Sequence, residues 1–122
     1  MKLKHLFYFN AILLIPGSLA LLIVPAVMLG RAGFPADNPE ILQLGSNTGG
    51  LLLFVGLVAW FAARVEDNPL RRNVRLSFFV MNLVMAVAHF IAFLNGGLIN
   101  AAILHGILAL AYGYFQFIKP DA

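Results

Sequence analysis

Two histidines, His89 and His105, lie in stretches that are otherwise apolar, on either side of an Asn-Gly-Gly break at residues 95–97. Neutral imidazole can bind a metal or a haem iron, hydrogen-bond a ligand or pass a proton. If the break is a tight turn between two helices, His89 precedes its centre by about seven residues and His105 follows it by about eight. At 1.5 Å per residue both side chains then lie at nearly one level. The pair is the first candidate site.

Further polar residues extend this pair along the same two stretches. Asn82 lies seven residues before His89, and therefore falls on the same face of a helix. Tyr112 follows His105 by seven residues, and Gln116 extends that edge. The predicted ligand-binding residues form one polar row: Asn82, His89, Asn100, His105 and Tyr112.

Three interpretations of this row are open. The imidazoles can hydrogen-bond across helices and fix their packing, which is the favoured interpretation. They can instead bind haem, a chlorophyll-type pigment, a metal or a quinone headgroup, or they can pass protons. Haem between the two histidines is disfavoured because the two helices are sequence neighbours with little room between them. A proton relay is disfavoured because no Asp or Glu lies within an apolar stretch. Haem or pigment is therefore not the favoured cofactor, and we assign no metal site.

The rest of the sequence excludes several functional classes. The chain has no cysteine, so disulfides, thiolate metal sites and Fe–S clusters are excluded. It has no Gly-rich phosphate loop, no HExxH or GxSxG motif and no paired carboxylates in an apolar stretch, so we predict no catalytic residue and no enzyme. The formal net charge of +3 lies near the ends of the apolar stretches and leaves no basic face for nucleic acid.

The composition indicates that the helices that contain the polar row lie in lipid rather than in water. Of 122 residues, 61% are hydrophobic and 11% are charged, whereas a soluble domain has about 25% charged residues. Each long apolar stretch has about 20 residues or more, enough to cross a hydrocarbon core about 30 Å thick. The predicted spans are residues 6–30, 41–63, 74–94 and 98–118. The sequence thus predicts an all-α polytopic membrane protein, a single domain over 1–122 with four transmembrane helices in a compact up-down bundle.

Local signals predict where these helices bend, begin and approach one another. Pro16 and Pro25 predict kinks in the first span, and Asn38 before Pro39 predicts the N-cap of the second. Small residues recur on one face of two spans, which allows close helix packing in lipid. They are Gly45, Gly49, Gly56 and Ala63 in the second span and Ala102, Gly106, Ala109 and Gly113 in the fourth. We expect these faces to pack inside the bundle rather than against another copy.

Basic residues gather at one set of helix ends. Lys2 and Lys4 precede the first span, and Lys119 follows the last. Four arginines surround the second connector: Arg64, Arg71, Arg72 and Arg75. The positive-inside rule then predicts that both termini and the 64–75 connector are cytoplasmic. The same arginines can contact anionic lipid headgroups or an acidic loop of a partner, although setting the topology is explanation enough.

Several stretches together resemble a known type of membrane protein. They are PGSLALLIVPAVMLG at 16–30, GGLLLFVGLVAWFAAR at 49–64, the basic connector after it and the Gly-broken final hairpin. This pattern, which covers nearly the whole chain, resembles the DoxX-like and related uncharacterised families of small four-helix bacterial membrane proteins. The resemblance implies a multi-pass protein of the bacterial inner (cytoplasmic) membrane, and it transfers no catalytic residue.

These observations lead to three functional hypotheses. The leading one is an accessory or structural subunit in the lipid bilayer that packs against another membrane protein or forms a homo-oligomer, because no domain outside the membrane is predicted. The alternative is a binder of a hydrophobic cofactor or small molecule (haem, pigment or quinone) through His89 and His105. The third is a small transporter or proton channel.

Overall fold

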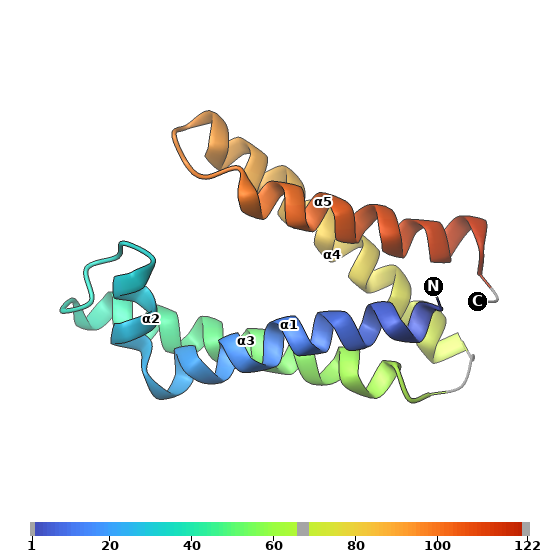
Figure 1. Ribbon diagram of the computed structural model, residues 1–122, viewed down its shortest axis with the longest axis horizontal. Coiled ribbons are helices and arrows are strands. Elements are labelled where there is room, and N and C mark those ends of the chain that lie inside the picture. The colour runs from blue at the N-terminus through green and yellow to red at the C-terminus, as the bar shows by residue number, and fades with distance from the viewer. Residues whose placement is uncertain (1, 66–68, 121–122) are drawn as a thin grey trace. The chain divides into compact units, whose positions relative to one another are not determined.

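The computed structural model of the protein describes residues 2–65 and 69–120. Its helices are α1 (Leu3–Ile23), α2 (Pro25–Arg31), α3 (Pro39–Ala62), α4 (Pro69–Leu94), α5 (Asn100–Gly113) and the π-helical segment η1 (Tyr114–Ile118) (Figure 1). No strand occurs among the described residues. The all-α class is therefore confirmed.

Four helical segments are long and apolar enough to cross a membrane. They are Leu3–Ile23, Pro39–Ala62, Pro69–Leu94 and Asn100–Ile118. Their lengths and compositions confirm the prediction of a multi-pass membrane protein with four spanning helices. The cytoplasmic location of the termini stays a prediction.

The first span predicted from the sequence, residues 6–30, forms two helices. α1 ends at Ile23 and α2 begins at Pro25, and Val24 between them has φ −134° and ψ 56°. Proline has no backbone N–H and disfavours a helical conformation of the residue before it, so the break falls at the predicted kink. Pro16, in contrast, lies inside α1 without ending it. The membrane-length part of this region is α1 alone.

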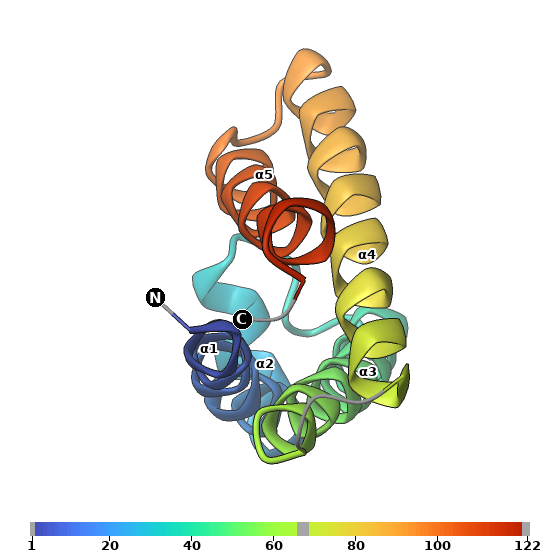
Figure 2. The ribbon, with the colours of Figure 1, turned by 90° about the vertical axis from the view of Figure 1, so that its right-hand side faces the viewer.

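The chain divides into two compact units, which are described separately. The N-terminal unit is Phe7–Arg64, with most of α1, all of α2 and all of α3. The C-terminal unit is Met1–Leu6 and Val65–Ala122, with α4, α5 and η1. Within the C-terminal unit, α4 and α5 run side by side (Figures 1 and 2). The single compact bundle over 1–122 stays a prediction.

In the N-terminal unit, α3 begins at its predicted cap and packs through its glycines. Asn38 accepts a hydrogen bond from the backbone N–H of Glu40 at 2.9 Å. A Cβ on Gly45 or Gly56 would lie 2.6 or 2.8 Å from a side-chain atom of α2 or α1, and one on Gly49 would lie 3.0 Å from the carbonyl oxygen of Ser18. A Cβ at any of the three would force its neighbour to shift, and at Gly49 that neighbour includes backbone, so the glycines allow the close approach of these helices. The glycine face of the second span therefore packs internally, as predicted.

Candidate functional site

α4 places three polar residues on the face that packs against α5. Arg75, Asn82 and His89 are seven residues apart, which is nearly two helical turns, and so they lie above one another. Arg75 and Asn82 are 1% and 0% exposed, and His89 is half-buried. The interior of this hairpin therefore holds a polar row rather than an apolar seam.

Asn82 links the two helices of the hairpin. Its Nδ2 donates a hydrogen bond of 2.8 Å to the carbonyl oxygen of Phe78, one turn earlier on α4. Its Oδ1 lies 2.9 Å from Nδ1 of His105 on α5. An amide oxygen can only accept, so Nδ1 of His105 is the donor and holds the proton. In the neutral imidazole, Nε2 of His105 then has a free lone pair.

His89 and His105 lie against each other, as their spacing from the turn predicts. Their ring centroids are 5.4 Å apart and their planes differ by 5°. Side chains on a helix lean toward its N-terminus, so on two antiparallel helices the two imidazoles lean toward each other. Within the described residues, neither the His89 ring nor Nε2 of His105 has a hydrogen-bond partner.

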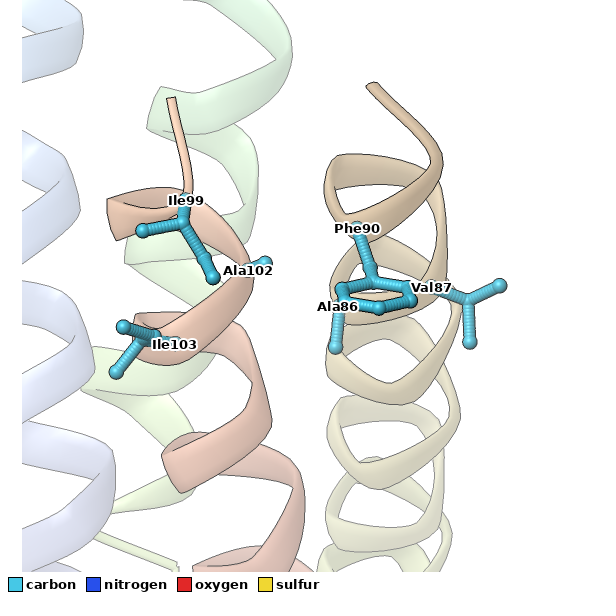
Figure 3. Close-up of a pocket in the computed structure, with 6 residues that line it drawn as sticks. All are labelled: Ala86, Val87, Phe90, Ile99, Ala102 and Ile103. Carbon is cyan, nitrogen blue, oxygen red and sulfur yellow. The ribbon is translucent and has the colours of Figure 1, made fainter. Parts of the chain in front are cut away.

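An open apolar groove of about 350 Å³ lies along the same hairpin. Figure 3 shows its lining, which comes from both helices and the residue before α5: Ala86, Val87, Phe90, Ile99, Ala102 and Ile103. Ala86 precedes His89 by three residues, and Ala102 precedes His105 by three. The groove therefore begins within one helical turn of each histidine, and its volume is within the range of small-molecule sites.

The row continues to the other end of the hairpin through Arg75. The Arg75 Nε donates to Oε1 of Gln116 at 2.8 Å, and its Nη1 donates to the carbonyl oxygen of Pro120 at 2.7 Å. Between this arginine and Asn82, the rings of Phe78 and Tyr112 are 5.3 Å apart. Tyr112 is fully buried. Arg75 thus connects α4 to η1 and to the segment after it.

The structure separates the predicted site residues into groups. Asn82, His89 and His105 are brought together, and Tyr112 is buried beside Phe78 on the same row. Asn100 is exposed at the first residue of α5 and does not join them. Arg75 belongs to the row, although its position in the basic connector predicts a contact with lipid or a partner. The signal was its spacing of seven residues from Asn82.

The remaining arginines differ from Arg75 in exposure. Arg64 and Arg72 are exposed and Arg71 is half-buried. The guanidinium carbon of Arg64 lies 4.7 Å from the centre of the Trp60 ring, within the N-terminal unit. Arg64 and Arg72 are therefore accessible to lipid headgroups, whereas the buried Arg75 is not.

The histidine pair does not fit a metal or a haem. Among residues 2–65 and 69–120, no group of three or more His, Asp or Glu side chains is placed to hold a metal ion, and protein metal sites generally use at least three such ligands. With their centroids only 5.4 Å apart, the two rings leave no space for a porphyrin between them.

No protein-family model, curated protein or solved structure matches this chain. The resemblance to DoxX-like proteins therefore stays a prediction. Function has to be inferred from the geometry of the α4–α5 hairpin.

Proposed function

We propose that this membrane protein binds a hydrophobic small molecule with a polar headgroup at the α4–α5 hairpin. The headgroup binds at His89 and His105, and the apolar body lies in the adjacent groove. The observation that supports this proposal is the free Nε2 lone pair of His105, one helical turn from a groove with an entirely apolar lining.

A role in helix packing alone explains less of this geometry. In lipid, a polar group without a partner costs free energy, so a histidine that serves only packing is expected to use its nitrogens within the hairpin. His105 uses Nδ1 in this way, but Nε2 has no partner among the described residues. A ligand headgroup would supply the missing partner.

The accessory-subunit hypothesis lacks a comparably specific observation. The exposed large side chains of α4 and α5, such as Leu83, Val84 and Leu110, are apolar. A helix in contact with lipid needs an apolar surface in any case, so this surface is not specific evidence for a protein partner. We therefore place ligand binding first and keep a subunit role, or a proton channel, as an outcome of the test.

The test is extraction of bound compounds from the full-length protein, purified from its membranes. We expect a lipophilic compound at about one molecule per chain in the wild type. His105→Leu keeps an apolar side chain of similar volume, and we expect it to lower the bound compound about tenfold, which corresponds to about 1.4 kcal/mol. His5→Leu is the matched control, because His5 is exposed near the start of α1.

Two results would contradict the proposal. One is an equal amount of the same compound in the wild type and in His105→Leu. The other is an extract with no bound compound, together with a membrane protein that co-purifies in constant ratio. The second result would support the accessory-subunit role. Circular dichroism of each variant confirms that the helices are retained.

A further inference from the structure

The amide of Asn82 is fixed in one orientation. Its Nδ2 donates to the carbonyl oxygen of Phe78 at 2.8 Å, and the side chain is 0% exposed. Rotating the amide by 180° would place Oδ1 against that carbonyl oxygen, so two acceptors would meet without water between them. The orientation that presents Oδ1 to α5 is therefore strongly preferred.

This orientation determines the hydrogen-bonding character of His105 toward a ligand. Nδ1 donates to Oδ1 of Asn82 at 2.9 Å, so a neutral ring offers only an acceptor at Nε2. A ligand with an O–H group complements this acceptor. A ligand whose headgroup is a carbonyl or an ether would place a second acceptor against Nε2 of His105, with no hydrogen bond formed to that nitrogen.

The charge distribution of the hairpin excludes ionic headgroups. Residues 76–118 contain no Lys, Arg, Asp or Glu. A phosphate or carboxylate headgroup would therefore find no cation along the groove, and an ammonium group would find no carboxylate. In a low-dielectric environment an unpaired ionic group is costly, so the ligand is neutral.

We infer that the site takes a neutral lipophilic alcohol or phenol, whose hydroxyl donates to Nε2 of His105 while its hydrocarbon body lies along Ala86, Phe90 and Ile103. This inference rests on the proposed binding function and adds the chemical class of the ligand.

The test compares two probes that differ only in the donor: 4-nonylphenol and its methyl ether, 4-nonylanisole. Their affinities are measured on the full-length protein in nanodiscs of zwitterionic lipid, by equilibrium partition against empty nanodiscs. We expect the phenol to bind about tenfold more tightly than the ether, the upper range for one hydrogen bond. Nitrogen-15 NMR of labelled histidine should show the Nδ1–H tautomer of His105.

Two variants connect this preference to the residues. Asn82→Leu removes the acceptor that fixes the tautomer, so His105 can donate from Nε2 to the ether oxygen. We expect the affinity ratio to fall to roughly twofold as the ether binds better. His105→Leu should weaken the phenol to the level of the ether, and His5→Leu should leave the ratio unchanged.

The outcomes separate the two proposals. If both probes bind equally and His105→Leu abolishes the binding of both, the hydroxyl preference is overturned but the proposed ligand site is supported. An Nε2–H tautomer in the wild type would also overturn the hydroxyl preference, even if Asn82→Leu does not fold. Binding of neither probe above empty nanodiscs, with no compound in the native extract, would overturn both.

Discussion

The two units of this protein hold their helices together in different ways. In the N-terminal unit, α3 approaches α1 through glycines, and at Gly49 the backbone oxygen of Ser18 is 3.0 Å from where a Cβ would be. In the C-terminal unit, α4 and α5 meet through hydrogen-bonded polar side chains and aromatic rings, among them Asn82 with His105. Lipid gives little hydrophobic drive for helix association, and both close backbone contact and interhelical hydrogen bonds can replace it.

The difference matters for function. The glycines at the contact of α3 with α1 contribute no side chain, and the buried Ser18 beside Gly49 donates its hydroxyl to the carbonyl oxygen of Ile15 at 2.8 Å, within its own helix. The polar interface, in contrast, contains imidazoles that have more hydrogen-bonding capacity than the hairpin uses. The second interface therefore has polar groups that a ligand headgroup can use.

The largest effect is expected from filling the glycine interface. Gly49→Leu would force a side chain against the backbone of Ser18, which cannot move aside as a flexible side chain could. We expect a loss of about 3 kcal/mol in the free energy of unfolding, the upper range for overpacking. The measurement is unfolding of the full chain in mixed micelles, by titration with a denaturing detergent.

The neighbouring glycine provides the control for this prediction. A Cβ on Gly50 would meet nothing within 4 Å, and the residue is exposed. Gly50→Leu should therefore change the free energy of unfolding by no more than about 0.5 kcal/mol. Equal losses for the two variants would mean that the close contact of α3 with α1 does not stabilise this unit.

A smaller loss is expected from breaking the polar interface at Arg75. Arg75→Met keeps much of the side-chain volume but removes the donors to Gln116 and Pro120, so those two oxygens lose their partner. We expect a loss of about 2 kcal/mol, within the range for hydrogen bonds donated by a charged group, because Arg75 itself is buried. The same unfolding titration measures it.

Arg72→Met is the matched control, since Arg72 is exposed on the same helix and close in sequence. Its effect should not exceed about 0.5 kcal/mol. If the free energy of unfolding falls equally in both variants, the basic connector rather than the polar row stabilises the C-terminal unit. The hydrogen bonds of Arg75 would then not distinguish this unit from the glycine-packed N-terminal unit.

The parts of this structure that sequence predicts are those with local causes. Long apolar runs give the four spanning helices, Pro25 gives the break at Val24, and Asn38 gives the start of α3. The meeting of His89 and His105 also follows from counting residues on each side of the turn, because both helices rise by the same amount per residue.

The parts that sequence does not predict depend on contacts between distant residues. The sequence marks Arg75 by its spacing of seven residues from Asn82, but the residues that hold it, Gln116 and Pro120, are 41 and 45 residues away. Asn100 lies five residues before His105, a spacing that does not place both on one helix face, and it is exposed where α5 begins. Sequence gives no signal for the π-helical turn η1, which places Gln116 near Arg75.

The smallest effect, and one of opposite sign, is expected at Gly106 on α5. The sequence places Gly106 on a face of small residues like that of α3, but a Cβ there would meet nothing within 4 Å. Gly106→Ala should therefore raise the free energy of unfolding by about 0.5 kcal/mol, because alanine loses less backbone entropy in a helix.

Gly113→Ala is the comparison on the same helix, because its Cβ would lie 3.1 Å from Cε2 of Phe79. The ring has to shift, which offsets the stability gained from the higher helix propensity of alanine, so we expect almost no change in the free energy of unfolding.

The same titration, run at two ratios of protein to detergent, also reports association. If Gly106→Ala instead loses stability, and loses more at high protein concentration, then this face of α5 packs against a second copy of the chain. The small-residue face of α5 would then have the role that the glycines of α3 have within the N-terminal unit, and the homo-oligomer hypothesis would gain its first specific contact.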